Sequence, residues 1–160
     1  ETRDYVFGAP MAFATLITKA KHIKNFTYLQ NFGPQAMTYR TASAGIYSNQ
    51  ITPEGNSFIT CECPADMSSD FWKNAPESHG DIWNECKALG VVSGEAELLD
   101  HAVVRVPSTF KVARLGYDEK IQEFHEELAK RNPPVIFRDP KPFFRRETYL
   151  DSRNILDLVA

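Results

Sequence analysis

Hydrophobic and polar residues alternate in short runs along the first half of the chain. A two-residue period is typical of strands with one buried face. In the run over 57–63, Phe58, Thr60 and Glu62 share one face, and the odd-numbered residues share the other. The predicted strands cover 13–19 (FATLITK), 26–31 (FTYLQN), 36–41 (AMTYRT) and 57–63 (SFITCEC), with turn signals at 32–34 and 52–56.

The second half of the chain changes to helical spacing. Ser78 begins a predicted helix, with Asp81 as its capping-box partner, and Gly90 ends it. Its apolar face is formed by Ile82, Cys86 and Leu89, with Trp83 beside them. A second helix is predicted from 117 or 118 to 131, with a buried face of Ile121, Phe124 and Leu128. The remaining predicted elements are a strand over 98–106 that ends at Pro107, a buried strand over 135–137 and a terminal helix over 151–158.

This order of elements predicts an α+β fold in a single domain spanning 1–160. We expect a mixed, largely antiparallel sheet with helices packed on one face. The helical crossovers from 57–63 to 98–106, and from there to 135–137, would each join parallel neighbours.

The amino-acid composition of the chain limits the classes of protein to which it could belong. The 160 residues are 42% hydrophobic and carry a net charge of −3, which excludes a disordered chain and disfavours a nucleic-acid or anionic-membrane binder. No apolar run approaches the roughly 18 residues of a membrane span. The odd count of three cysteines indicates reduced thiols and a cytoplasmic location. Because the chain begins at Glu1, either a leader has been removed or the chain is a piece of a longer protein.

The motifs of common enzyme classes are missing. The eight glycines form no phosphate-binding loop, and the sequence has neither a nucleophile elbow nor a zinc-binding H-E-x-x-H pair. Cys61, Cys63 and Cys86 are interpreted as core thiols, and no metal site is predicted. The four histidines are scattered and have no evident orienting partner, so no catalytic residue is predicted.

Arg40 and a basic cluster in the last part of the chain each allow more than one interpretation. Arg40 follows Tyr39 in a predicted strand, where it would contact a ligand or pair across strands with Glu62. The last 23 residues hold a basic cluster interleaved with aromatics, which suits an anionic cofactor, a solvated surface or the seam of another domain. The cluster comprises Arg138, Lys141, Arg145, Arg146 and Arg153.

Three segments between Phe26 and Tyr117 resemble the substrate-binding domain of FAD-dependent amine-oxidase-like proteins. The resemblance is to the branch near protoporphyrinogen oxidases and UDP-galactopyranose-mutase-like proteins. It is carried by the order and spacing of loose motifs over about two thirds of the chain. The segments are Phe26-Thr27-Tyr28 followed by Tyr39-Arg40, the block TPEGNSFITCECP over 52–64 followed by Asp70-Phe71-Trp72, and VRVPSTF over 104–110 followed by Gly116-Tyr117.

The resemblance implies that this chain performs its function together with an FAD-binding domain that the sequence does not contain. FAD would lie in a Rossmann-like domain of the same protein, and this domain would cover the flavin and bind a small-molecule substrate. The whole protein would transfer a hydride between substrate and flavin, whereas this chain alone would be inactive. The matching positions assign substrate contact to Tyr28, Tyr39, Arg40 and Phe110, and cofactor contact to Arg138.

The sequence departs from the family at several points. The Rossmann-like part is absent, Phe110-Lys111 replaces a usual Tyr-Pro, and Arg138 lacks the glycine that usually precedes it. These departures support a second hypothesis, a stand-alone, non-catalytic module that binds a small molecule or another protein. A small independent enzyme is the weakest hypothesis, because no pair of nucleophile and base is evident.

Overall fold

The computed structural model describes residues 5–48, 51 and 55–131. The chain divides into two compact units, one formed by Val6–Arg114 and the other by Glu1–Tyr5 with Leu115–Ala160. The predicted strand over 135–137, the predicted helix over 151–158 and the basic cluster that includes Arg138 lie outside the described residues.

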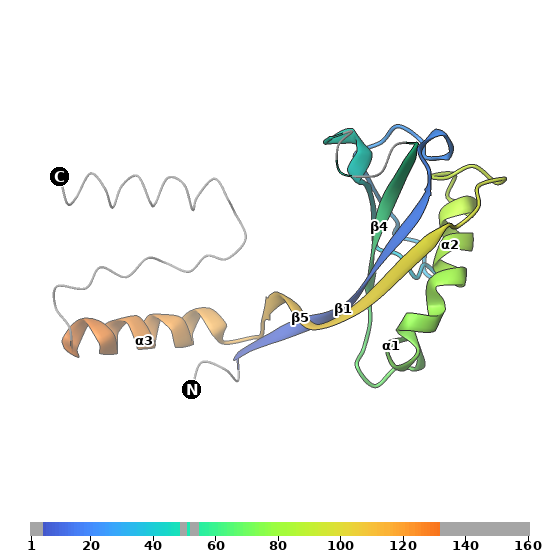
Figure 1. Ribbon diagram of the computed structural model, residues 1–160. Coiled ribbons are helices and arrows are strands. Elements are labelled where there is room, and N and C mark those ends of the chain that lie inside the picture. The colour runs from blue at the N-terminus through green and yellow to red at the C-terminus, as the bar shows by residue number, and fades with distance from the viewer. Residues whose placement is uncertain (1–4, 49–50, 52–54, 132–160) are drawn as a thin grey trace, which may run out of the picture. The chain divides into compact units, whose positions relative to one another are not determined.

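The unit Val6–Arg114 is built on a five-stranded sheet with the order β2-β3-β4-β1-β5 (Figure 1). Every pair of neighbouring strands is antiparallel, which confirms the predicted α+β fold with a largely antiparallel sheet. The expected parallel neighbours do not occur in the described sheet, because β1 lies between β4 and β5. The strands are β1 (Val6–Lys19), β2 (Tyr28–Gln30), β3 (Arg40–Ser43), β4 (Asn56–Pro64) and β5 (Asp100–Ala113).

Strands β1 and β5 are longer than their sequence patterns predict. Each has 14 residues, and β5 continues through Pro107, where the sequence predicted an end. Two features explain this continuation. β5 is an edge strand, and its pairing with β1 shifts register between Ala9 and Met11. Proline, which has no backbone N–H, is tolerated in a strand at an edge or a bulge.

Two short helices and a 3-10 turn cover one face of this sheet. They are α1 (Asp70–Lys73), η4 (Ala75–Ser78) and α2 (His79–Ala88). α2 confirms the helix predicted after Ser78, and Gly90, with φ of 69°, follows its end. The predicted capping box is wrong, because the Ser78 hydroxyl donates to the Asn74 carbonyl at 3.1 Å instead of accepting from α2. Ser69 caps α1, where its Oγ accepts from the Trp72 N–H at 3.1 Å.

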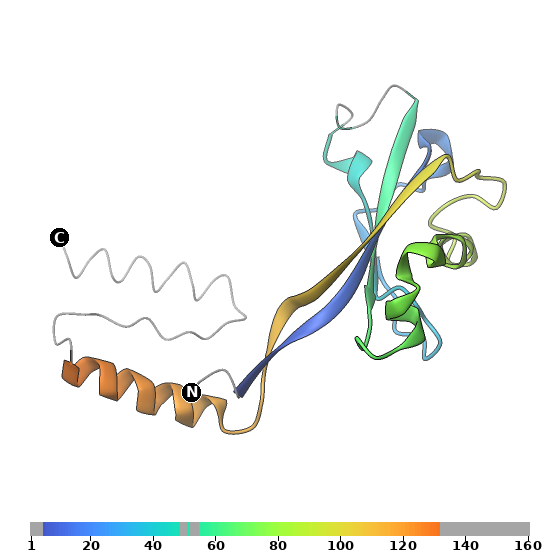
Figure 2. The same cartoon turned by 60° about the horizontal axis from the view of Figure 1, so that its bottom comes forward.

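The core lies between the helices and this face of the sheet. The predicted face of α2 is buried through Ile82, Trp83 and Cys86, and Leu89 packs against it. The facing strand residues are small or aliphatic, which leaves space for the large Trp83 side chain. They include Ala12, Ala14, Leu16, Ile59, Cys61 and Cys63. Figure 2 shows α1 and α2 on one side of the sheet, so these two helices leave its second face open.

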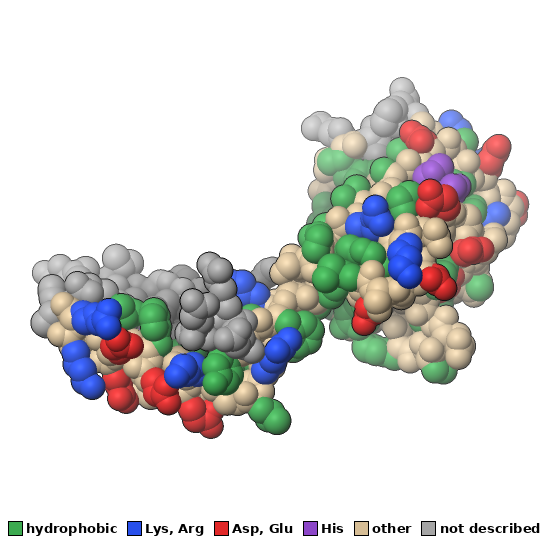
Figure 3. Space-filling view, turned by 90° about the horizontal axis from the view of Figure 1, so that it is seen from below, with side chains coloured by type: hydrophobic (Ala, Val, Ile, Leu, Met, Phe, Trp, Pro, Cys, Tyr) green, Lys and Arg blue, Asp and Glu red, His purple; other side chains and the backbone are tan. Residues whose placement is uncertain are grey.

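The second unit contains α3 (Tyr117–Arg131), which confirms the second predicted helix. The predicted buried face is wrong for the described residues. α3 has no buried residue, and Phe124 is 44% exposed, because no described layer packs on that face. Acidic and basic side chains lie along the helix (Figure 3), among them Lys120, whose Nζ lies 2.6 Å from Glu123 Oε2. None of the described helices is long and apolar enough to cross a bilayer.

Candidate functional site

The face of the sheet opposite the helices is the candidate site, and we call it the open face. Its side chains are half-buried or exposed, although several are apolar, whereas the same strands are tightly packed on their other face. Directly paired residues of antiparallel strands share a face. The register therefore places together Arg40 and Ala42 of β3, Phe58, Thr60 and Glu62 of β4, Phe13, Thr15 and Ile17 of β1, and Ala102 and Val104 of β5.

Arg40 and Glu62 form an ion pair on the open face. They are direct register partners on β3 and β4, which confirms that cross-strand pairing accounts for Arg40. The Arg40 Nε donates to Glu62 Oε1 at 3.0 Å, and Nη2 donates to the same oxygen. The Arg40 side chain is 39% exposed and that of Glu62 is 14% exposed, so the arginine lies on the solvent side of the pair. The hydrogen bond to Glu62 raises the pKa of Arg40, which stays charged.

The second oxygen of Glu62 has no partner in the part of the chain that the structure describes. Oε2 is buried and has no hydrogen bond to any described residue. A buried carboxylate oxygen normally accepts at least one hydrogen bond, and leaving it unsatisfied is costly. The open face therefore combines a partly exposed guanidinium with an unused acceptor, an arrangement that suits a polar group supplied from outside the described residues.

Aromatic side chains lie near Arg40, at the β2 edge of the sheet. Tyr28 of β2 pairs with Ala42 and is 58% exposed, so it belongs to the open face. Tyr39 directly precedes β3 and packs edge-to-face against Phe32, with ring centroids 5.9 Å apart. The Tyr39 hydroxyl also accepts from Gln30 Nε2 at 3.0 Å. Three of the four predicted substrate residues, Tyr28, Tyr39 and Arg40, are thus brought to one edge.

Glu85 positions the loop that leads into Tyr39 and Arg40, a role that sequence reasoning missed. Its carboxylate accepts from the backbone N–H groups of Met37 and Thr38, from the Thr38 hydroxyl and from Asn31 Nδ2. Partial burial raises the pKa of Glu85, but these hydrogen bonds outweigh burial and hold the pKa below its usual value. The sequence offered only a weak signal, a carboxylate directly before Cys86, which lies on the apolar face of the helix.

Phe110 does not join the other predicted site residues. It lies on β5 beyond the register shift, pairs with Ala9 and is 51% exposed. β2 and β5 form opposite edges of the sheet, with three strands between them. The other outlying prediction, Arg138, lies outside the described residues.

The cysteines lie in the core, as predicted. Cys61, Cys63 and Cys86 are buried and free, and the Sγ atoms of Cys61 and Cys86 are 3.5 Å apart. Burial raises the pKa of Cys63, and the contact with Cys61 together with burial raises the pKa of Cys86. Among the described residues, no group of three or more histidine, cysteine or acidic side chains is arranged to hold a metal ion.

Comparisons with known proteins agree with the fold of the predicted family. No protein-family model matches the chain, and no curated protein matches it. Among solved structures, the chain is similar to reduced UDP-galactopyranose mutase, with a TM-score of 0.65 and 17% sequence identity. The similarity covers 81% of this chain and 28% of that chain. At this level of identity the two proteins are related by their fold, over a little more than a quarter of the mutase.

Proposed function

We propose that this chain is the substrate-binding module of a FAD-dependent, amine-oxidase-like oxidoreductase whose FAD-binding domain lies in another part of the protein. The observation that carries the proposal is the Arg40–Glu62 pair on a sheet face that α1 and α2 leave open. The similarity in fold to part of UDP-galactopyranose mutase supports it. A cytoplasmic location, inferred from the thiols, remains a prediction.

The connections of the unit Val6–Arg114 support a place within a larger protein. Val6 at its beginning pairs with Ala113 near its end, so the chain enters and leaves through neighbouring strands. Adjacent ends are what a module inserted into another domain requires. The share of the mutase that this chain covers, 28%, is consistent with such a part.

We assign the FAD site to the other domain and not to the described residues of this chain. The sequence has no glycine-rich phosphate loop, and the described helix N-termini present no such loop to a pyrophosphate. FAD, which supplies hydride-transfer chemistry when bound, would be held by the other domain. The contribution of this chain would be to bind and orient the substrate and to exclude water from the space under the open face.

Each predicted residue has a defined part in this proposal. Arg40 would hold an anionic or strongly polar group of the substrate, because its guanidinium is partly exposed and charged. Tyr28 and Tyr39 would flank that group at the β2 edge. Phe110, on the opposite edge strand, would contact the substrate only through a second domain or a larger ligand. A cofactor contact by Arg138 is carried over from the family resemblance alone.

The first test uses the protein in its source. An antibody raised against this chain should detect a band well above 18.1 kDa, and the purified protein should show a flavin absorption spectrum. In that protein, Arg40→Ala combined with Glu62→Gln should raise KM and leave the melting temperature within about 2 °C of the unmodified protein. Lys73→Ala, a change on α1 at a 59% exposed side chain, is the matched control and should leave KM unchanged. An unchanged KM in the double variant would contradict the role of Arg40.

A stand-alone, non-catalytic binding module is the second candidate. The observation in its favour is that the unit Val6–Arg114 closes its own core with α1 and α2 and needs no other domain for that purpose. A single band at 18 kDa and no bound flavin would favour this candidate over the oxidoreductase module.

A further inference from the structure

A small recess lies on the other side of the sheet from Arg40. It has a volume of about 220 Å³ and opens between the ends of β3 and β4 and the segment that follows β1. Its floor is formed by Ser43 and Ser57, which alternate with Arg40 and Glu62 and so belong to the face that the helices cover. The recess is therefore separate from the open face, and conclusions about it do not depend on the proposed function.

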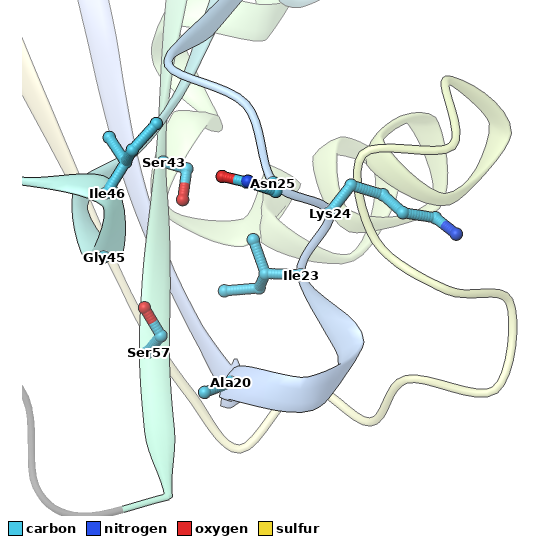
Figure 4. Close-up of a pocket in the computed structure, with 8 residues that line it drawn as sticks. All are labelled: Ala20, Ile23, Lys24, Asn25, Ser43, Gly45, Ile46 and Ser57. Atoms are coloured by element: carbon cyan, nitrogen blue, oxygen red, sulfur yellow. The ribbon is translucent and has the colours of Figure 1, made fainter. Parts of the chain in front are cut away.

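The two serines are unusual floor residues. Ser43 is 5% exposed and Ser57 is 6% exposed, on the strand face that also carries the buried apolar residues Ile59 and Cys61. Both serines line the recess, so their hydroxyls can reach a ligand bound there. Figure 4 shows the Asn25 carboxamide directed toward Ser43 across the recess. Hydrogen-bonding capacity thus converges on a space that the described side chains leave empty.

The rest of the lining is apolar or small. Ile23 and Ile46 line opposite sides, and Gly45 leaves the approach to Ser57 clear. A Cβ at position 45 would lie 2.8 Å from Ser57 Oγ, so the absence of a side chain there keeps the hydroxyl accessible. Among the described residues that line the recess, Lys24 is the only charged one, and Figure 4 shows its ammonium group pointing away from the recess.

We propose that this recess binds a small neutral sugar or polyol. A charged ligand would lose its hydration without gaining a partner of opposite charge, which disfavours anions and cations. Hydroxyl and carboxamide groups both donate and accept, so Ser43, Ser57 and Asn25 match the adjacent hydroxyls of a polyol. The C–H face of the ligand would lie against Ile23 and Ile46. The volume, below the 300–1,000 Å³ of drug-sized sites, suits a single ring or a shorter chain.

The test is a titration of the full chain followed by amide resonances in nuclear magnetic resonance. D-glucose and glycerol are the probes, and acetamide and inorganic phosphate are the comparison compounds. We expect saturable shifts of the Ser43, Gly45 and Ser57 backbone amides and of the Asn25 side-chain amide, with a Kd for glucose on the order of 1–10 mM. Acetamide and phosphate should leave these resonances in place.

Variants identify the groups responsible. Ser57→Ala and Asn25→Ala should each weaken glucose binding by about fivefold, the effect of losing one hydrogen bond. Gly45→Ala should block binding by filling the approach to Ser57. Ser108→Ala, on the exposed surface of β5, is the control and should bind as the unmodified chain does. Asn25 is exposed, so its variant keeps the test decisive even if a serine variant does not fold.

Three results would overturn the proposal. The first is the absence of saturable shifts with either polyol, which would mean that the recess holds water only. The second is a stronger response to phosphate than to glucose, which would mean that Lys24 creates an anion site. The third is glucose binding that all three recess variants retain.

Discussion

Arg40 binds Glu62 through one carboxylate oxygen only, and the other oxygen of Glu62 is buried without a partner among the described residues. The pair stands at the boundary between packed sheet and open face, with the arginine more exposed than the acid. Such a pair is stabilised within the sheet and still has unused hydrogen-bonding capacity. Because of this geometry, we expect substitutions at the two positions to differ in their cost to stability.

Arg40→Ala should cost more stability than Glu62→Gln. Removing the arginine leaves a largely buried carboxylate without its counter-charge, whereas Glu62→Gln leaves a partly exposed guanidinium that water can solvate. We expect a coupling energy of about 1–2 kcal/mol between the two positions, between the values for exposed and buried pairs. A double-mutant cycle measured by urea unfolding at neutral pH checks this, and additive effects of the two changes would contradict it.

The stability contributed by Glu85 should depend on pH. Hydrogen bonds from the 31–38 loop lower the pKa of Glu85 in the folded state, so its contribution is fully present above the unfolded value of about 4.3. It is lost as the pH falls through the lower folded value. Glu85→Gln should therefore lower the free energy of unfolding by about 1–3 kcal/mol at pH 7.

The difference in unfolding free energy between the wild-type chain and Glu85→Gln should shrink as the pH falls below the unfolded value of about 4.3 and through the lower folded value. Urea unfolding at pH 7 and at a series of acidic pH values measures this dependence. Glu95→Gln changes an 81% exposed carboxylate and serves as the control. A difference that stays constant with pH would show that Glu85 acts through shape rather than charge.

The three thiols should resist modification in the folded chain. All three are buried, which keeps the reagent away from them, and burial raises the pKa of Cys63. The hydrogen bond with Cys86 lowers the pKa of Cys61, so Cys61 is protected by burial alone. We expect Ellman's reagent to label the native chain slowly and to label all three cysteines after unfolding in guanidinium. Rapid labelling of one cysteine per native chain would indicate that α2 opens readily away from β4.

Two glycines should respond in opposite directions to alanine. A Cβ at Gly8 would lie 2.9 Å from the Cα of Ser108, so Gly8→Ala forces β1 and β5 apart at the register shift. We expect a loss of about 1–3 kcal/mol. Gly80 lies in α2 with nothing within 4 Å of its virtual Cβ, so Gly80→Ala should stabilise by about 0.5–1 kcal/mol. Thermal melts of both variants provide the comparison, and a neutral Gly8→Ala would contradict the close approach.

Local patterns in the sequence were sufficient to predict whether most elements are helices or strands and which face of each is buried. Alternation in β4 assigned Ile59, Cys61 and Cys63 to the core and Glu62 to the other face, and helical spacing assigned Ile82 and Cys86 to the face of α2 that is buried. These features depend on residues within one or two turns or on one strand, where period and side-chain direction are coupled. The predicted face of α3 shows the limit, because a pattern does not specify which layer covers it.

Features that join distant residues depended on the tertiary structure. The alternation of β4 could not show that β1 separates it from β5, because strand order depends on how the whole chain folds. The same holds for Glu85, which binds a loop 47 and 48 residues earlier in the chain, and for the recess floored by Ser43 and Ser57. The sequence alone identified Arg40 as a candidate site residue and left two interpretations open, contact with a ligand or pairing with Glu62. Only the antiparallel register of β3 and β4 decided that Glu62 lies opposite it, because pairing distance is a property of the assembled sheet.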